Sequence, residues 1–415
     1  MILDIYNLKS ILLKSTFSRN SSIYILSSII SSGISFVLLT VLTHYLTKSD
    51  FGIIENFIAI STLFTSFMLW GGDISIINYY SEKHQKNVFS NAFIAIINQT
   101  IFLLLIVCIL NFEILSINKW LLISGCLYAF MQATYSVITT SYQLEGKSLS
   151  YSITSVSLSI LNSIITFFLV IYIHNYLSRI IGLISSSLII LIIIVFKFYR
   201  SKRFNTAISL SSIRNFYIVG FPLVIAQVAS WLVERSDRVL VSKILSLDDL
   251  GVYGLGFQFG MIILVIQSAI SRAWLPYIIE KVKIGQKRKL KKSIFLISLV
   301  LFIITVLISI FVFLYIRLFI NPAFRDASWI AVIISLSYYF DGIWKLYNGI
   351  LVYENNFRFY SMLIIISGIC KVCLNIIFIS HIGIMGAAIT TLITFFFGFI
   401  INYWYVHYKL KWFEI

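Results

Sequence analysis

The stretch Leu46-Thr-Lys-Ser-Asp-Phe-Gly52 follows the first long apolar segment of the chain, and the similar stretch Leu245-Ser-Leu-Asp-Asp-Leu-Gly251 follows the seventh, at an offset of 199 residues. Further along, Tyr151-Ser152 recurs as Tyr360-Ser361, at an offset of 209. Matches that keep their order along the chain predict an internal repeat. Because an even number of apolar segments separates equivalent positions, the two copies have the same orientation, and the sequence predicts two parallel lobes.

The composition indicates that the chain is embedded in lipid. Of its 415 residues, 59% are hydrophobic and only 12% are charged, against about 25% charged residues in soluble domains. An ordinary cytosolic enzyme, a disordered protein and a disulfide-stapled secreted module are therefore excluded. Because about 20 apolar residues cross a bilayer as a helix, we expect an all-α polytopic membrane protein with six transmembrane helices in each lobe. The twelve predicted spans are residues 21–46, 51–71, 88–110, 120–143, 151–173, 180–196, 216–241, 251–271, 293–316, 329–352, 359–380 and 382–406.

The basic residues predict the orientation in the membrane. Lys and Arg number 32 against 16 Asp and Glu, which gives a formal net charge of +16. In a soluble protein this excess would suggest nucleic acid. Here the positive-inside rule accounts for it, and we expect no nucleic-acid partner. Most basic residues of the predicted loops fall on one side of the membrane, so both termini are expected to face the cytoplasm.

The same pattern divides the chain into five regions. Residues 1–20 are amphipathic and are expected to form an interfacial helix. One six-helix lobe over residues 21–199 and a second over residues 216–406 are joined by a basic cytoplasmic linker, residues 200–215. Residues 407–415 are expected to form a cytoplasmic tail.

Charged residues inside the predicted spans are the candidate functional residues, because a charge at mid-bilayer is costly and normally faces a cavity or a partner. In the seventh span Glu234 and Arg238 are four residues apart, which allows an ion pair along one helix face. Asp341 and Lys345 have the same spacing in the tenth span. Local ion pairs that only stabilise the helices are the alternative interpretation of both pairs.

Lys371 stands alone among the charged residues of the eleventh span. Because it has no charged neighbour in its own helix, its partner is expected on another helix. Asp237 and Asp341 are the candidates for that partner.

The repeat also predicts a gate. At the offset of 199, Asp73 at the inner end of the second span corresponds to Arg272 at the inner end of the eighth. Equivalent positions of two parallel lobes face each other across the axis between the lobes. We therefore expect Asp73 and Arg272 to pair and to close the cytoplasmic side while the cavity is open to the outside.

No metal site or catalytic site is expected. Cys370 and Cys373 have the Cys-x-x-Cys spacing of metal and redox sites, but they lie in an apolar span, where packing is the simpler explanation. The histidines lie near span ends without clustering, and no outward loop is long enough for a catalytic domain. We therefore do not expect an enzyme.

Several stretches of the chain resemble one known family, the Wzx-type polysaccharide flippases of the multidrug/oligosaccharidyl-lipid/polysaccharide exporter superfamily. The resemblance runs nearly from end to end and is most specific in the seventh and eleventh spans. It is carried by Val41–Gly52, by Gly220-Phe-Pro-Leu223 through Ser236-Asp237-Arg238 to Leu250-Gly-Val-Tyr253, by Trp274-Leu-Pro276, by Leu374-Asn375 and by Ile382–Ala388. This resemblance implies a MATE-like arrangement of helices, in agreement with the predicted repeat.

The resemblance also implies a function. Flippases of this family move undecaprenyl-diphosphate-linked oligosaccharide units, the precursors of O-antigen or a similar surface polysaccharide, from the cytoplasmic to the outer leaflet of the bacterial inner membrane. It implies alternating access coupled to a gradient of H⁺ or Na⁺, with no other cofactor. The expected partners are the lipid-linked oligosaccharide, the membrane, a polysaccharide polymerase and a chain-length regulator. A multidrug exporter of the same fold, which would bind cations with acidic residues, stays open as the alternative.

Within this resemblance, basic residues in the membrane would hold the anionic cargo and acidic residues would couple transport to the ion gradient. The candidate substrate-binding residues are Arg235, Arg238, Arg272, Lys345 and Lys371, and the candidate coupling residues are Glu234, Asp237 and Asp341. Arg238 lies in a motif of the family, whereas the others rest on their position inside the membrane. Because acidic and basic groups balance within the spans, charge alone does not identify the cargo.

Overall fold

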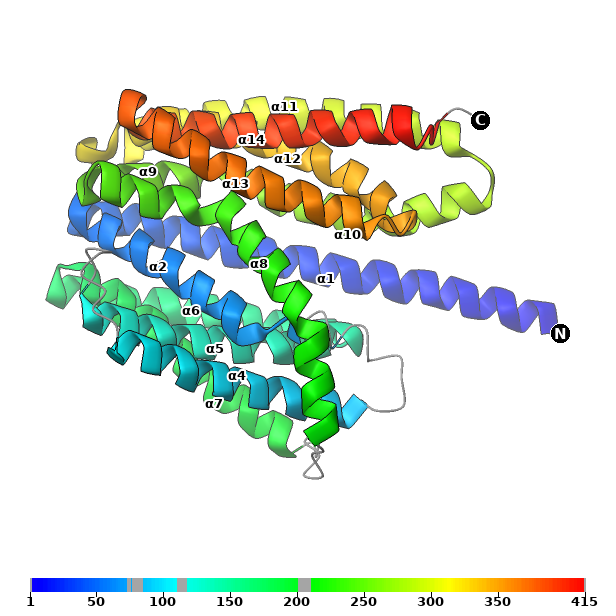
Figure 1. Ribbon diagram of the computed structural model, residues 1–415, viewed down its shortest axis with the longest axis horizontal. Helices are drawn as coiled ribbons and strands as arrows, with labels where there is room; N and C mark the ends of the chain where they lie inside the picture. Colours follow the sequence, from blue (N-terminus) through cyan, green and yellow to red (C-terminus); the bar gives the residue numbers. More distant parts are fainter. Residues whose placement is uncertain (1, 73–75, 77–84, 110–117, 201–209, 414–415) are drawn as a thin grey trace.

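The computed structural model describes residues 2–72, 76, 85–109, 118–200 and 210–413, and over these residues the chain is helical without a strand. The helices run side by side in two groups, one above the other in Figure 1. The first lobe contains α1 (Ile2–Tyr45), α2 (Lys48–Leu69), α4 (Gln85–Ile109), α5 (Lys119–Leu144), α6 (Ser148–Ile173) and α7 (Tyr176–Arg200). The second lobe contains α8 (Leu210–Ile244), α9 (Leu247–Gly260), α10 (Ile263–Lys283), α11 (Lys287–Phe319), α12 (Ala327–Tyr353), α13 (Phe357–Ile382) and α14 (Ile384–Trp404). The predicted all-α fold is confirmed.

Eleven helices of the described chain are long and apolar enough to cross a membrane. The predicted span over residues 251–271 is not one of them, because it is divided between α9 and α10. At the division, the N–H of Ile262 donates to the carbonyl of Phe259, and the N–H of Leu264 donates to the carbonyl of Met261. These bonds reach back three residues instead of four, which tightens the turn and interrupts the regular helix. Together α9 and α10 take the place of the eighth span.

The surface around both lobes suits lipid. Leu307 and Phe311 of α11 and Ile193 of α7 are all more than half exposed. Soluble monomers rarely expose extended apolar patches of this kind. The molecule is therefore a polytopic membrane protein.

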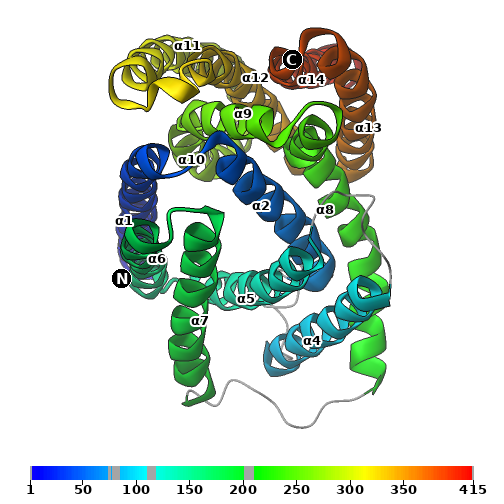
Figure 2. The ribbon, with the colours of Figure 1, turned by 90° about the vertical axis from the view of Figure 1, so that its left-hand side faces the viewer.

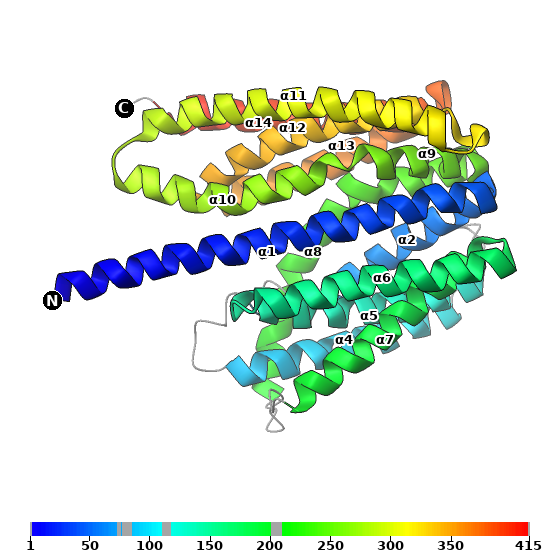
Figure 3. The same cartoon turned by 180° about the vertical axis from the view of Figure 1, so that it is seen from behind.

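The first helix is longer than a membrane span. α1 is one continuous helix of 44 residues, about 66 Å long at ~1.5 Å per residue. Figure 3 shows its first part extending beyond the other helices and its second part lying beside α6. No helix boundary separates residues 2–20 from the first span, and the interfacial position expected for residues 1–20 stays a prediction.

The repeat is visible where α2 and α9 begin. Thr47 caps α2, because its side chain accepts a hydrogen bond from the N–H of Asp50. Ser246 caps α9 in the same way, with the N–H of Asp249 as the donor. The two caps are equivalent at the offset of 199, and each satisfies a backbone donor that a helix start leaves unpaired.

α2 and α9 pack against each other through two glycines, at what we call the glycine contact. A Cβ atom at Gly52 would lie 2.0 Å from the carbonyl oxygen of Leu247, and a Cβ atom at Gly251 would lie 2.0 Å from that of Lys48. No side chain fits at either distance, so both positions require glycine. The two halves of the contact are equivalent at the offset of 199, and Figure 2 shows α2 and α9 adjacent at the interface between the lobes. The sequence repeat thus brings its two copies face to face.

α8 connects the two lobes. Its 35 residues include Pro222, which removes a backbone hydrogen bond and bends the helix, as Figure 1 shows. Before the bend, α8 packs on the first lobe, where the Nε1 of Trp70 donates to the carbonyl of Tyr217 at 3.0 Å and Phe216 joins the core. After the bend it packs on α13. The described residues of the expected linker, 200–215, belong to α7 and α8.

Candidate functional site

A cavity of about 420 Å³, which we call the central cavity, lies between the two lobes. Residues of α1, α2, α6 and α7 line it on one side, and residues of α8, α9 and α10 line it on the other. The first lobe contributes Arg179 and three serines of α1, and the second lobe contributes Arg235. The serines are Ser31, Ser32 and Ser35. Most of the wall is apolar, and its polar part combines hydroxyl groups and the carboxylate of Glu55 with cationic groups from both lobes.

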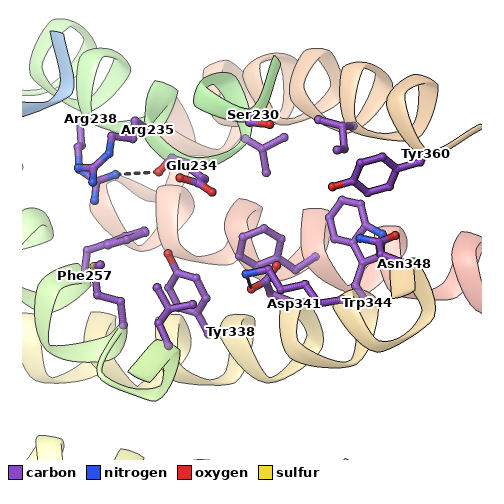
Figure 4. Close-up of a pocket in the computed structure, with 16 residues that line it drawn as sticks. Ser230, Glu234, Arg235, Arg238, Phe257, Tyr338, Asp341, Trp344, Asn348 and Tyr360 are labelled. Carbon is purple, nitrogen blue, oxygen red and sulfur yellow. Dashed lines mark hydrogen bonds and ion pairs between the residues drawn. The ribbon is translucent and has the colours of Figure 1, made fainter. Parts of the chain in front are cut away.

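A smaller cavity of about 190 Å³, the second-lobe cavity, lies between α8, α9, α10, α12, α13 and α14 (Figure 4). It adjoins the central cavity, because Arg235, Arg238, Met261 and Leu264 contribute to both walls. Much of its remaining wall is aromatic. The rings belong to Phe257, Tyr338, Trp344, Tyr360 and Phe395.

Four buried charges form one network beside these cavities. Asp237 lies at its centre and is 0% exposed. Its Oδ1 accepts from Arg238 Nη1 at 2.9 Å, and its Oδ2 accepts from Lys371 Nζ at 2.9 Å. The Nε of Arg238 donates in turn to Oε2 of Glu55 at 3.1 Å. Opposite charges with good hydrogen-bond geometry offset much of the cost of burial, and the formal charges of the four groups sum to zero.

The network ties helices of both lobes together. Glu55 lies on α2, Asp237 and Arg238 lie on α8, and Lys371 lies on α13. The pair between Glu55 and Arg238 therefore crosses the lobe interface. Tyr253 of α9 adds a hydrogen bond from its hydroxyl to Oδ2 of Asp237 at 2.8 Å.

A glycine makes room for the carboxylate of Glu55. A Cβ atom at Gly254 would lie 2.3 Å from Cγ of Glu55. Gly254 is also the equivalent of Glu55 at the offset of 199, so the two positions face each other across the interface. One turn further along α9, the side-chain amide of Gln258 donates to Oε1 of Glu55. The carboxylate of Glu55 thus occupies the space between the two equivalent positions, and the absence of a side chain at Gly254 leaves room for it.

Two of the predicted pairings are confirmed. Lys345 Nζ lies 2.6 Å from Oδ2 of Asp341, four residues earlier on α12. Lys371 takes its partner from another helix, and of the two candidates the partner is Asp237. These pairings were accessible from the sequence because spacing along one helix, or the lack of a neighbour on it, constrains where a partner lies.

The predicted ion pair between Glu234 and Arg238 is wrong. Arg238 Nη1 donates to the main-chain carbonyl of Glu234 at 3.0 Å, while its guanidinium is engaged by the carboxylates of Glu55 and Asp237. The carboxylate of Glu234 instead lines the second-lobe cavity. Within the described chain, neither Glu234 nor Arg235 has an ion pair.

Two charged residues of the central cavity, Arg179 and Glu55, are not among the predicted site residues. Arg179 lies near the start of α7, where its position in the sequence suggests an outer loop. In the structure its Nη1 donates to Oδ1 of Asn162 at 3.0 Å, and its side chain lines the cavity. Glu55 lies near the end of a predicted span, and no partner on its own helix marks it. Asn162, a polar residue in the middle of an apolar span, is the one signal that could have pointed toward Arg179.

The predicted gate lies outside the part of the chain that can be tested. Asp73 is not among the described residues, and for Arg272 the structure describes the backbone in α10. The pairing of Asp73 with Arg272 therefore stays a prediction. Over the described residues, no group of three or more His, Cys, Asp or Glu is arranged to hold a metal ion, and Cys370 and Cys373 are exposed on α13.

Comparison with known sequences identifies related proteins. Residues 17–282 match a family model described as polysaccharide biosynthesis protein. Lsg locus protein 1 of Haemophilus influenzae is 26% identical over 282 residues, an alignment that covers 64% of this chain and 66% of that protein. An uncharacterised membrane protein of the same organism is 24% identical over 275 residues, with coverage of 64% and 66%. The chain thus spans just under two thirds of the length of these curated relatives.

Solved structures share the fold. The structure of the lipid II flippase MurJ in an inward closed conformation gives a TM-score of 0.75 at 14% identity, and covers 94% of this chain and 89% of that one. The structure of the MATE multidrug transporter DinF-BH gives a TM-score of 0.66 at 15% identity, with 97% of each chain covered. The MATE-like arrangement predicted from the sequence is confirmed.

Proposed function

The chain belongs to the family of polysaccharide biosynthesis proteins, and on that premise we propose that it is a flippase for oligosaccharide units linked to undecaprenyl diphosphate. The observation that carries the proposal is the central cavity, which Arg179 of one lobe and Arg235 of the other line together with serines of α1. Arginine binds phosphate oxygens through paired, charge-assisted hydrogen bonds. Serine hydroxyls both donate to and accept from sugar hydroxyls. The wall therefore suits a cargo that joins a diphosphate to sugars.

Four of the basic residues fall into two groups. Arg235, together with Arg179, binds the diphosphate, because Arg235 lines both cavities and has no ion pair within the described chain. Arg238 and Lys371 hold the helices in place, because the carboxylates of Glu55 and Asp237 already engage them. Removing either of these two groups would disturb the fold before it changed the affinity for cargo.

Ion coupling is assigned to the second-lobe cavity. Glu234 and Asp341 line it and exchange a proton or a sodium ion with the cavity, so that an H⁺ or Na⁺ gradient drives transport without a resident cofactor. Asp237 is the third proposed coupling group, although its oxygens are occupied by Lys371 and Arg238 in this structure. Lys345 and Arg272 stay proposed contacts for the cargo.

We assign alternating access to the lobe interface. The glycine contact closes the end at which α2 and α9 begin, and the proposed pair of Asp73 and Arg272 closes the opposite end in the other state. With both termini in the cytoplasm, cargo enters from the inner leaflet of the bacterial inner membrane and leaves to the outer leaflet. The units then serve the synthesis of O-antigen or a similar surface polysaccharide, with a polymerase and a chain-length regulator as partners in the membrane.

One observation favours a second candidate, a multidrug exporter. Glu234 faces the second-lobe cavity among the rings of Tyr338, Trp344 and Tyr360. A carboxylate without an ion pair beside aromatic rings also suits an organic cation. This candidate and the flippase make opposite predictions about surface polysaccharide.

The test is deletion of the gene in its own organism, followed by complementation. For a flippase, the deletion abolishes surface polysaccharide, and lipid-linked single units accumulate protected inside the cell. Arg235→Gln and Arg179→Gln fail to complement, whereas Arg317→Gln, at an exposed arginine of α11, complements fully. Normal surface polysaccharide with new sensitivity to cationic drugs would establish the exporter instead. Unpolymerised units on the outer leaflet would contradict the flippase and indicate a polymerase.

A further inference from the structure

The second-lobe cavity has a different chemistry from the central cavity. The polar groups of the central cavity are serine hydroxyls, the carboxylate of Glu55 and arginines. The smaller cavity combines five aromatic rings and the amide of Asn348 with charged groups, and it shares two arginines with the central cavity. Figure 4 shows Glu234, Tyr338, Trp344 and Tyr360 arranged around one space. Its volume of about 190 Å³ is many times the ~10–15 Å³ that a single water needs. A ring-sized polar group therefore fits.

This wall has unsatisfied hydrogen-bonding capacity. Trp344 is only 5% exposed, and its Nε1 has no hydrogen-bond partner among the described residues. A buried donor without a partner is costly, so a ligand that reached Nε1 and accepted from it would relieve that cost. The Tyr360 hydroxyl likewise has no hydrogen bond within the described chain. The cavity thus offers donors and rings together.

A sugar ring complements both features. Its C–H faces are apolar and pack on aromatic rings, and its hydroxyl groups accept from indole and phenol donors. A pocket with rings and a few convergent polar groups binds a small ligand in one orientation. The ordinary alternative is an organic cation held by Glu234, which needs rings and a carboxylate but leaves the Tyr360 hydroxyl unpaired.

The position of the cavity fits the cargo as well. The two cavities share Arg235 in their walls. In a lipid-linked oligosaccharide the first sugar is bonded directly to the diphosphate. A diphosphate bound at Arg235 in the central cavity therefore presents that sugar to the adjoining space.

The geometry points to a sugar-binding site: the second-lobe cavity takes the first sugar of the lipid-linked cargo, with Trp344 and Tyr360 as the residues that recognise it. The inference rests on the proposed function and deepens it, since it assigns the diphosphate and the sugar to different cavities. Arg235 then fixes the charge of the cargo, and the rings fix the identity of its first sugar.

The test measures binding to the purified full-length protein in lipid nanodiscs. Two probes are compared: undecaprenyl diphosphate, and the lipid-linked unit that accumulates in the deletion strain. The wild-type protein binds the sugar-bearing lipid about tenfold more tightly, the effect of one stacked ring or one hydrogen bond. Trp344→Ala and the gentler Tyr360→Phe remove most of this preference and leave the affinity for undecaprenyl diphosphate within about twofold. Trp329→Ala, at an exposed tryptophan of the same helix, changes neither affinity.

The outcomes separate the two proposals. Equal affinity for both lipids in the wild-type protein would overturn the sugar site, and so would a preference that survives Trp344→Ala and Tyr360→Phe. In either case the flippase stands as long as Arg235→Gln weakens undecaprenyl diphosphate binding. If no lipid-linked unit accumulates and neither lipid binds, the proposed function itself fails. Binding of a cationic dye that depends on Glu234 and not on Trp344 would show that the cavity takes organic cations.

Discussion

The helix pairs α1–α2 and α8–α9 are copies of one unit, and they agree at one end of the lobe interface and differ in its middle. At the starts of α2 and α9 the caps are equivalent, and so are the glycines that bring the two helices together. Deeper in the membrane, Glu55 of α2 faces its own equivalent, Gly254 of α9. The parts of the two copies that are equivalent therefore form the close contact between the lobes, and the parts that differ carry the charged groups.

The same contrast holds between α1 and α8. At the offset of 199, Asp237 and Arg238 of α8 correspond to Leu38 and Leu39 of α1, and all four side chains are buried. One copy of the repeat has an apolar core at this level, while the other carries a charge network. The second lobe thus contains most of the charged residues of the network and the cavities. The first lobe contributes Glu55 and Arg179.

The largest effect is expected where the asymmetry is greatest, at Asp237. Asp237→Ala leaves Lys371 and part of Arg238 buried without a counter-charge, which costs about 3–5 kcal/mol of stability. The measurement is thermal unfolding of the purified protein in detergent, with Asp326→Ala at an exposed carboxylate as the control. Unfolding of Asp237→Ala at the temperature of the control would mean that the network does not stabilise the fold.

The glycine contact should respond symmetrically. Gly52→Ala and Gly251→Ala each push α2 and α9 apart, at a cost of about 1–3 kcal/mol for an overpacked site. This cost shifts the interface toward its open state by roughly fivefold or more. A cysteine introduced by Ser35→Cys in the central cavity, in a background without the native cysteines, reports the opening through its labelling by a membrane-impermeant thiol reagent.

Gly33→Ala is the matched control, because no atom lies within 4 Å of a Cβ at Gly33. Faster labelling with both Gly52→Ala and Gly251→Ala and with no change for Gly33→Ala is the expected result. A large effect at only one of the two glycines would show that the contact is not the symmetric closure that the repeat suggests.

A smaller effect is expected at Glu55. Glu55→Gln keeps the shape of the side chain and an oxygen that can accept from Arg238, but it loses the charge of the ion pair across the lobe interface, at a cost of about 0.5–1.5 kcal/mol. Arg238 keeps Asp237 as a partner, so the fold survives. Labelling of the same cysteine should rise severalfold. Unchanged labelling would show that the ion pair does not help to keep the interface closed, and that the glycine contact alone does so.

The smallest effects are expected at the caps. Thr47→Ala and Ser246→Ala each remove one capping bond, worth about 1 kcal/mol. Thermal unfolding should show a slightly larger loss for Thr47→Ala, because Asp50 of the same cap also accepts from the backbone N–H of Tyr176 at 3.0 Å. A larger loss of stability for Ser246→Ala would show that the two caps differ in their contribution to stability although their geometry is similar.

Much of the fold could be predicted from the sequence, because hydropathy counts spans and a repeat fixes their relative orientation. The division between α9 and α10 could not be predicted, since no proline marks Met261 or Ile262 and the turn tightens within an apolar run. In the site, the pair of Asp341 and Lys345 follows from spacing along one helix.

The pair of Glu55 and Arg238 joins two helices far apart in the sequence, so only their packing reveals it. The position of Arg179 in the wall of the central cavity could not be predicted for a related reason. For a residue near a helix end, the sequence is compatible with a loop position and with a cavity position. Only the position of the neighbouring helix distinguishes the two.

The neutrality of the buried network has an electrical consequence. A membrane potential does work of about 2.3 kcal/mol per 100 mV on each elementary charge that crosses the bilayer. Glu55, Asp237, Arg238 and Lys371 carry two negative and two positive charges, so moving them together performs no net electrical work. The resting potential therefore does not bias the closed core of this protein. It acts on charges outside the network, such as Arg235, Glu234 and the cargo itself.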